Sequence, residues 1–284
     1  MTIDFEGLID CNPIYRAKNV YSNGELITEV VIPESITEIK RYAFYGWDTL
    51  TKVVMHDNVT SIGRYAFDAC VGLTTVRLSN GLTSLGDSAF RGNTNLAYNT
   101  YDNAKYLGNE TNPYIALVSY TDREITSCEI NENTKMIGST AFLACKNLTS
   151  IYIPQSVIAI GDSAFQNCTS LAMVTFAENS QVNSISNVFY GCSSLKSIII
   201  PANCTELGYM TFYGCSSLTS IYIPKNVIKE GKNTFINCSN LVIYCEFTEE
   251  ECQMADGWNN NSTSTTCTTY YGYTLEQYLT AIGG

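Results

Sequence analysis

Cysteine is the residue type with the clearest capacity for chemistry here, because the chain of 284 residues contains 12 of them. A thiol can ligate a metal, act as a nucleophile or form a disulfide. No Cys-x-x-Cys pair occurs, so zinc-ribbon spacing is missing and we expect no metal site. Six cysteines instead recur at one offset, three residues after a phenylalanine: Cys70, Cys145, Cys168, Cys192, Cys215 and Cys238.

Few other residues of the chain could support catalysis. His56 is the only histidine, so any Ser-His or Cys-His pair must use it, and we expect it in a solvated turn. The carboxylates Glu249, Glu250 and Glu251 are explained by capping of a short helix that begins near Thr248. Acid pairs of the glycosidase type depend on distance in space, and nothing in the sequence favours one. We therefore predict a protein that is not an enzyme and holds no cofactor.

Charge and hydropathy exclude two classes of partner. The chain has 16 basic and 27 acidic residues, a net charge of −11, which repels the phosphates of nucleic acid. No apolar run approaches the ~18 residues of a membrane helix, so we expect no membrane insertion. The start, MTIDFEGLIDC, shows no basic segment followed by an apolar core, so no signal peptide is visible. The protein then either stays in the cytoplasm or is a piece of a longer chain.

An internal repeat positions these residues. Phenylalanines recur every 23 or 24 residues, with one interval of 52, at Phe44, Phe67, Phe90, Phe142, Phe165, Phe189, Phe212 and Phe235. The clearest copy is LTSIYIPQSVIAIGDSAFQNC, from Leu148 to Cys168. This period lies in the range of leucine-rich repeats, in which stacked coils share one core.

Each column of the repeat predicts an element. Leu148, Ile151 and Ile153 form a short strand with inward side chains, and a column of ten Leu or Ile residues predicts ten such strands in one parallel sheet. Glycines, as at Gly63 and Gly231, are expected to turn the chain. The Ala-Phe step should open a short helical turn with Phe inside. The fold class is an α/β repeat solenoid.

Three regions follow along the chain. Residues 1–26 form an N-terminal cap with a β-turn element, 27–247 the solenoid, and 248–284 a C-terminal cap and a polar, linker-like tail with a possible last helix. An insert at 97–124 lacks the repeat signals. Its runs 105–107 and 114–120 flank a turn-rich stretch, which predicts a β-hairpin that projects from the solenoid.

The cysteine column has two interpretations once the coils are in place. Coils ~4.8 Å apart would allow a ladder of disulfides. Thiols that point in parallel into a packed interior would instead behave as small hydrophobic groups. We favour buried, reduced, structural cysteines, and pairing among the others stays open: Cys11, Cys128, Cys204, Cys245, Cys252 and Cys267.

The columns LxxIxIPxxVxxIGxxAFxxCxxL at 148–171 resemble the BspA-like class of bacterial leucine-rich repeats. The similarity covers residues 27–247, with local departures such as Trp47 and Asn93 in place of Cys and Glu230 in place of an apolar residue. The resemblance implies a right-handed solenoid on cell-surface proteins that adhere to host or matrix proteins. It transfers no catalytic motif.

The outward half of each strand is the candidate binding surface, because the repeat does not dictate residue type there. Aromatic residues and arginine dominate the energetics of protein interfaces, although such residues also simply favour strands. The predicted partner-binding residues are Val54, Arg77, Tyr152, Thr175, Ile199 and Tyr222, and a secondary patch on the insert comprises Tyr101, Tyr106 and Tyr114.

The sequence as a whole predicts a monomeric, non-catalytic protein-binding module. With the family resemblance, we expect a cell-surface adhesion or recognition protein, or a fragment of one, that binds a host or matrix protein. Its location would be extracellular or on the cell surface if it is part of a longer secreted chain. A passive spacer or stalk is the alternative, and a hydrolase that uses surface carboxylates is a third.

Overall fold

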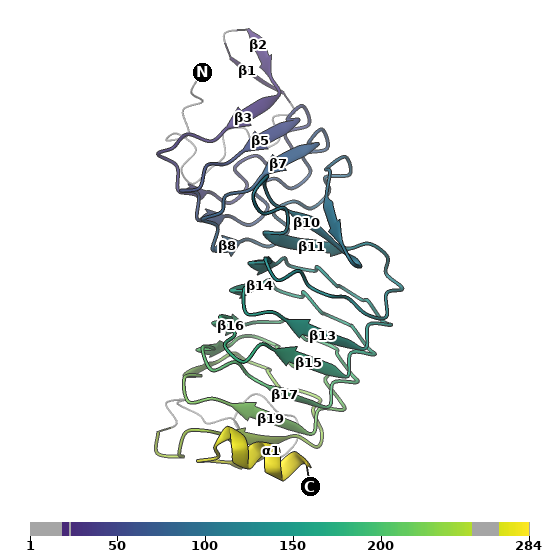
Figure 1. Cartoon of the computed structure of the whole chain (residues 1–284), viewed down its shortest axis with the longest axis vertical. Coiled ribbons are helices and arrows are strands. Elements are labelled where there is room, and N and C mark those ends of the chain that lie inside the picture. Colours follow the sequence, from purple (N-terminus) through teal and green to yellow (C-terminus); the bar gives the residue numbers. More distant parts are fainter. Residues whose placement is uncertain (1–18, 23, 252–266, 284) are drawn as a thin grey trace. The chain divides into compact units, whose positions relative to one another are not determined.

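The computed structural model describes residues 19–22, 24–251 and 267–283, which divide into two compact units. Unit 1 comprises the described part of residues 1–100 with 105–118 and 133–139, and unit 2 comprises 101–104, 119–132 and the described part of 140–284. In both units the chain winds in coils, most of which have a longer strand and a two-residue strand on the return path (Figure 1).

In unit 1 the longer strands are β3 (Glu29–Val31), β5 (Lys52–Val54) and β7 (Thr75–Arg77), which pair in parallel. The return strands β4 (Glu38–Ile39), β6 (Ser61–Ile62) and β8 (Ser84–Leu85) form a second parallel sheet. The two sheets enclose one apolar interior between them, as the stacking of equivalent side chains requires.

In unit 2 one parallel sheet contains β13 (Ser150–Ile153), β15 (Met173–Phe176), β17 (Ser197–Ile199), β19 (Ser220–Ile223), β21 (Val242–Cys245) and β22 (Thr268–Tyr270) in that order. The return strands are β14 (Ala159–Ile160), β16 (Ser184–Ile185), β18 (Glu206–Leu207) and β20 (Lys229–Glu230). In β13 the side chains of Ile151 and Ile153 are buried, as the alternation predicted.

The predicted helical turn at the Ala-Phe step is a series of hydrogen-bonded turns and not a helix. Two residues before each of the eight phenylalanines, φ is left-handed, between 52° and 63°, at Tyr42, Tyr65, Ser88, Thr140, Ser163, Asn187, Met210 and Asn233. A second left-handed residue comes two positions after each phenylalanine, for example Ala144 at 57°. Since an α-helix needs negative φ throughout, two such residues per coil prevent one.

The phenylalanines form the core as stacked rings. In unit 2, Phe165 lies between Phe142 and Phe189, with ring centroids 5.1 and 5.7 Å apart and interplanar angles of 6° and 13°. In unit 1, Phe67 lies in the same way between Phe44 and Phe90, at 4.8 and 5.2 Å. These rings are at most 8% exposed, so the predicted inward position of the column is confirmed.

The cysteine column lies beside the ring stack, buried and without disulfides among the described residues. Five of its thiols donate a hydrogen bond to the carbonyl of the phenylalanine one coil earlier, at Sγ–O distances of 3.0 to 3.2 Å. Asn93 occupies the same column and donates from Nδ2 to the Phe67 carbonyl at 2.9 Å. The column therefore supplies a donor to a buried backbone carbonyl in six coils, which explains why a small donor recurs there.

The glycines that end the return strands were predicted to turn the chain, and the structure gives them a different role. Gly63 has no left-handed φ, but a β-carbon on it would lie 2.5 Å from the backbone nitrogen of Arg41 in the preceding coil. Gly231 approaches the backbone of residues 208–209 in the same way. Close approach of neighbouring coils therefore explains these glycines better than turn geometry.

The insert contributes to both units. Strands β9 (Asn99–Tyr101), β10 (Ala104–Leu107), β11 (Ala116–Tyr120) and β12 (Met136–Ile137) belong to one sheet, in which β11 and β12 are parallel. Tyr106, Ile115 and Leu117 are fully buried, so these strands carry core residues. A projecting β-hairpin stays a prediction.

The expectation of ten strands in one parallel sheet is wrong in two respects. The longer strands divide among separate sheets, with β3, β5 and β7 in one, β9 in the sheet of the insert, and β13 to β22 in another. The described residues 125–131 form no strand, because side chains of the insert take up their backbone groups. Asn103 donates to the Ser127 carbonyl at 2.9 Å, and Asp102 accepts from the Glu129 amide at 2.7 Å.

The ends of the solenoid differ in part from the predictions. A hairpin of β1 (Val20–Ser22) and β2 (Glu25–Ile27) forms the N-terminal β-turn element, with Gly24 at a φ of 84°. Thr248 and Glu251 make the reciprocal hydrogen bonds of a capping box, at 2.8 and 3.2 Å, while the helix predicted after them lies outside the described residues.

The described end of the tail, residues 267–283, forms regular structure, including a strand that the polar, linker-like prediction did not include. Thr268 and Thr269 lie in β22 and pair with β21, so this part is not a linker. The helix α1 (Leu275–Gly283) follows, and Thr274 with Gln277 forms its capping box. At nine residues α1 is too short to cross a bilayer, and no other described helix is long and apolar enough to do so.

Candidate functional site

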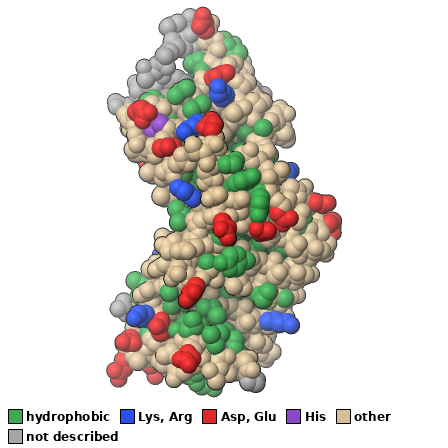
Figure 2. All heavy atoms as spheres, in the orientation of Figure 1, with side chains coloured by type: hydrophobic (Ala, Val, Ile, Leu, Met, Phe, Trp, Pro, Cys, Tyr) green, Lys and Arg blue, Asp and Glu red, His purple; other side chains and the backbone are tan. Residues whose placement is uncertain are grey.

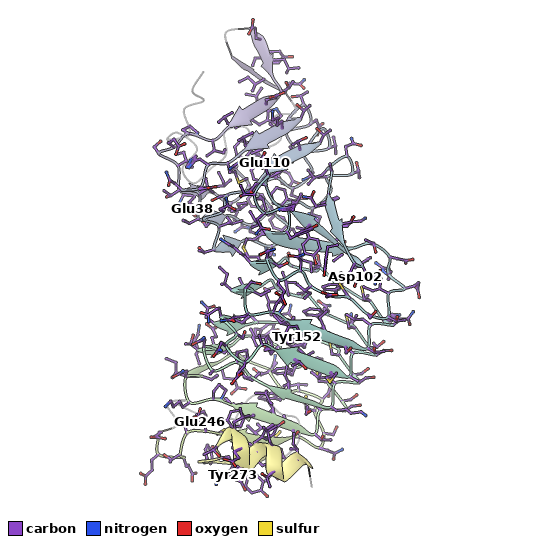
Figure 3. The ribbon with its side chains drawn as sticks, viewed as in Figure 1. Glu38, Asp102, Glu110, Tyr152, Glu246 and Tyr273 are labelled. Carbon is purple, nitrogen blue, oxygen red and sulfur yellow. The ribbon has the colours of Figure 1, made fainter. Side chains whose placement is uncertain are left out.

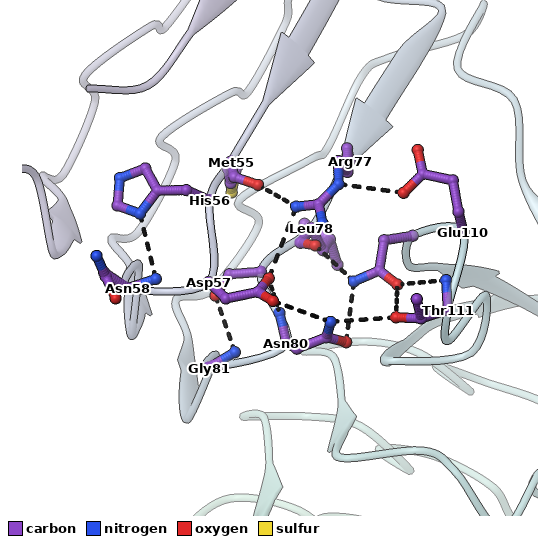
Figure 4. A network of polar contacts seen from close by, with 12 residues as sticks. Met55, His56, Asp57, Asn58, Arg77, Leu78, Asn80, Gly81, Glu110 and Thr111 are labelled. Carbon is purple, nitrogen blue, oxygen red and sulfur yellow. Dashed lines mark hydrogen bonds and ion pairs between the residues drawn. The ribbon is translucent and has the colours of Figure 1, made fainter. Parts of the chain in front are cut away.

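Arg77, predicted to bind a partner, lies in a polar network within unit 1 (Figure 4). Its Nε donates to Glu110 Oε2 at 3.1 Å, and its Nη1 bonds the Met55 carbonyl and lies 3.6 Å from Asp57 Oδ1. Hydrogen bonds from the Asn80 amide and side chain to Asp57, at 3.0 and 3.2 Å, lower the pKa of this carboxyl group. The bond to Glu110 joins β7 to the insert, and the contacts with Met55 and Asp57 join β7 to the preceding coil, so we infer a structural role for Arg77.

The turn of the insert is held by the same network. Asn109 donates to the Leu78 carbonyl and to Asn80 Oδ1, at 3.0 and 2.9 Å, while its own Oδ1 accepts from the amides of Thr111 and Asn112. Asn109 is buried, whereas the carboxylate of Glu110 is 77% exposed. This part of unit 1 is therefore rigid and polar. Val54, paired in register with Arg77, is half-buried beside it.

His56 is not a solvated turn residue as predicted, because only 11% of its side chain is exposed. Its Nε2 lies 2.6 Å from the Pro33 carbonyl, and its Nδ1 accepts from the Asn58 amide at 3.2 Å and lies 3.3 Å from Glu34. Both ring nitrogens are engaged by backbone groups, so the imidazole serves to join two coils.

The secondary patch on the insert is not one surface. Tyr106 is fully buried and meets the half-buried Tyr114 edge to face, with ring centroids 5.4 Å apart. Tyr101 donates to Glu129 Oε1 at 2.7 Å, and this hydrogen bond raises the pKa of the phenol. The prediction of an exposed position is wrong for Tyr106, because its strand is part of the core.

The strands β13, β15 and β17 of unit 2 present the other predicted residues to solvent. We use the term open face for the outward side chains of these strands, Tyr152, Met173, Thr175 and Ile199. Tyr152 is 54% exposed, Met173 58% and Ile199 37%, and Thr175 is paired in register with Tyr152. Three large apolar side chains on adjacent strands form an accessible, preordered surface, which is typical of a binding site. Figure 3 shows Tyr152 on its strand.

Tyr222 was predicted on this surface and is buried, at 4% exposure. The C-terminal helix covers it: the ring of Tyr278 lies 5.5 Å from that of Tyr222 and 5.2 Å from that of Tyr244, and the hydroxyl groups of Tyr278 and Ser220 are 3.3 Å apart. Burial raises the pKa of Tyr222 to about 12 and also raises that of Tyr278. The helix α1 therefore bounds the open face at β19, and Tyr222 does not belong to that face.

An apolar groove of about 490 Å³ runs between the open face and α1. Met173 and Ile199 from the sheet and Leu275 and Ile282 from the helix are among its lining residues. Figure 2 shows hydrophobic side chains gathered over this part of unit 2, with both acidic and basic side chains around them. The volume lies within the ~300–1,000 Å³ of small-ligand pockets, although the groove is open along its length.

Two carboxylates also line the groove, Glu178 and Glu246. Glu178 is exposed, and the half-buried Glu246 accepts a hydrogen bond from the Lys225 amide at 3.0 Å (Figure 3). Neither carboxylate forms an ion pair with a described lysine or arginine. Their charge is therefore available to a cation on a bound molecule.

The column thiols are held in an unreactive form. Burial raises the pKa of Cys70, Cys168 and Cys238 to about 12 and that of Cys145 to about 11. Because the thiolate is the nucleophile and the metal ligand, such thiols do little chemistry near neutral pH. The described residues also contain no group of three His, Cys, Asp or Glu side chains close enough to hold a metal ion.

The sequence analysis missed the side chains that α1 brings to the groove. The apolar residues Leu275, Tyr278, Leu279 and Ile282 follow the spacing of one helix face, and Thr274-x-x-Gln277 is a readable start signal. These signals predict the helix but do not indicate the surface on which it packs.

Comparisons with known proteins agree with this fold. Residues 16–111 and 114–242 match the BspA-type leucine-rich repeat region in six copies. No curated protein matches the chain. A leucine-rich cell surface protein of Faecalibacterium prausnitzii is 25% identical, with a TM-score of 0.52, over 88% of this chain and 90% of that one.

Two further solved structures resemble the chain less closely. The pneumococcal vaccine antigen PcpA is 18% identical, with a TM-score of 0.49, over 87% of this chain and 80% of that one. A leucine-rich repeat protein of Eubacterium ventriosum is 20% identical, with a TM-score of 0.37, over 76% and 77% of the two chains. Given the repeat, the parallel sheets and the extent of the family match, the chain belongs to the BspA-type leucine-rich repeat proteins.

Proposed function

We propose that this chain is a non-catalytic protein-binding module of a bacterial cell-surface protein, and that it binds its partner, a host or matrix protein, through the open face of unit 2. The observation that carries the proposal is the exposure of Tyr152, Met173 and Ile199 on three adjacent strands. The backbones of these strands are fixed by parallel pairing, so binding would require little loss of conformational entropy in the chain.

The family supports the same conclusion. Leucine-rich repeat domains generally mediate protein interactions, and the similar protein from Faecalibacterium prausnitzii is described as a cell surface protein. The proposal of adhesion is more specific than that of protein binding. It rests on the combination of an exposed apolar surface with that family, since a passive spacer needs no such surface.

The experiment measures binding of the whole chain to a panel of immobilised, purified matrix and serum proteins. The test variant is the triple substitution Tyr152→Thr, Met173→Thr and Ile199→Thr, which keeps strand propensity while removing apolar area. The control is the double substitution Tyr209→Thr and Ile228→Thr, at side chains that are 50% and 54% exposed but do not line the groove.

We expect the parent chain to bind at least one protein of the panel and the triple variant to bind it at least tenfold more weakly, with the control unchanged. Equal binding by the triple variant would refute the open face as the binding surface. Cleavage of a panel protein would contradict the absence of catalysis, and no binding to any of them would favour the spacer.

A further inference from the structure

We infer that the groove between the open face and α1 binds an amphipathic α-helical segment of a partner protein, with lysine or arginine beside its apolar stripe. The inference rests on the proposed function and names the kind of partner segment that it recognises. It depends on the apolar faces of the groove, the packing of α1 on the same sheet, and the charge at the border.

The helix α1 shows how this sheet receives a helix. It lies over β19 and β21 and places Tyr278, fully buried, against Tyr222 and Tyr244. Its apolar stripe is only partly used, since Leu275 is 41% exposed, Leu279 48% and Ile282 41%. Leu275 and Ile282 line the groove, so these two side chains of the stripe face the open face, whereas Leu279 does not line it.

The dimensions fit a second helix beside the first. Parallel strands lie ~4.8 Å apart, so a helix ~10 Å across covers about two strands. As α1 covers β19 and β21, the next position corresponds to β15 and β17, where Met173 and Ile199 are exposed. A helix there would bury these side chains together with Leu275 and Ile282, which an extended peptide on the strands alone would not.

Charge selects among the possible occupants. Glu178 and Glu246 line the groove without an ion pair to a described lysine or arginine, and the chain carries a net charge of −11. A second copy of this chain would bring the same negative charge to the groove, and its α1 stripe is flanked by Glu276. A basic amphipathic helix complements the border instead.

The test uses the whole chain and fluorescein-labelled synthetic peptides of about four helical turns, measured by fluorescence anisotropy. The probe has leucines at i, i+3, i+4 and i+7 spacing with flanking lysines. A scrambled peptide of the same composition removes the stripe, and a third peptide replaces each lysine by glutamate. We expect the probe to bind at least tenfold more tightly than either, with a preference over the glutamate peptide that falls as salt is added.

Variants then locate the site. Ile199→Thr should weaken probe binding at least tenfold, whereas the matched Ile228→Thr should leave it unchanged. The pair Glu178→Gln and Glu246→Gln should reduce the preference for lysine to less than threefold, and glutamine can still accept the Lys225 amide. Circular dichroism checks that each variant remains folded.

Several results would overturn the inference. Equal binding of the probe and the scrambled peptide would refute recognition of a helix, and equal binding of lysine and glutamate peptides would refute the charge selection. A dimer in sedimentation experiments that dissociates on Ile199→Thr would assign the groove to a second copy. If no peptide binds while a matrix protein still depends on Ile199, the inference falls and the proposed function stands.

Discussion

The coil that contains Asn93 offers a sharp test of why cysteine recurs in this fold. In five other coils a thiol donates to the carbonyl of the preceding phenylalanine. Asn93 makes the same bond from Nδ2, but its Oδ1 is buried and meets no donor among the described residues. We therefore expect Asn93→Cys to stabilise the protein.

The expected gain follows from two opposing terms. Asparagine and cysteine have similar volumes, so the exchange leaves little cavity. Removing a buried acceptor without a partner recovers about 1–3 kcal/mol. The thiol is a weaker donor than the amide, and this difference costs about 0.5–1 kcal/mol of the bond to the Phe67 carbonyl. The free energy of unfolding should rise by about 0.5–2 kcal/mol.

The measurement is urea unfolding in reducing buffer, followed by the fluorescence of Trp47, which is 1% exposed in the same unit. A Trp258→Phe background removes the other tryptophan. The reverse substitution in the same unit, Cys70→Asn, should destabilise the protein by about 1–3 kcal/mol, since it buries an amide oxygen without a donor. If Asn93→Cys unfolds at the same or lower urea concentration as the parent, the argument about the column is wrong.

Three further predictions test the core and the C-terminal cap. Phe165→Ala should lower the free energy of unfolding by about 3–5 kcal/mol, because the ring is fully buried between two others; a loss below about 2 kcal/mol in urea unfolding would contradict this. A disulfide-exchange reagent near neutral pH should label the six column thiols slowly in the folded protein and quickly in urea, since burial raises their pKa; fast labelling of all six when folded would refute it. Tyr222 has a pKa of about 12 in the folded protein, against ~10 in the unfolded chain. The protonated phenol therefore contributes its full stabilisation of the fold below pH ~10, and this contribution is lost as the pH rises towards 12. Alkaline unfolding should therefore shift to higher pH in Tyr222→Phe, and an unchanged midpoint would count against its burial.

Much of the fold was predictable from the sequence because, in a repeat, the position of one residue predicts the positions of its equivalents in the other coils. Phe165 has equivalents at a spacing of 23 or 24 residues, and stacking in register follows directly from that period. The burial of the cysteine column follows from the same spacing. The role of Gly63 was not predictable in this way, because it depends on how closely the backbones of two coils approach.

The outward surface that we propose for binding was predicted only in part. Strand alternation correctly placed Tyr152 and Ile199 outward, since period 2 is a local property. It placed Tyr222 outward as well, but the side chain that covers it, Tyr278, comes 56 residues later. Arg77 likewise meets Glu110, 33 residues away. Contacts between segments without a shared period cannot be inferred from either segment alone.

The left-handed residues that flank each phenylalanine have a consequence for how the chain folds. Outside glycine, such a conformation costs about 1–2 kcal/mol per residue, so a single coil has no stable local structure of its own. Only ring stacking and hydrogen bonds to an adjacent coil offset that cost. We therefore expect folding to nucleate on two consecutive coils at once, and a peptide of one repeat length to be a random coil in water.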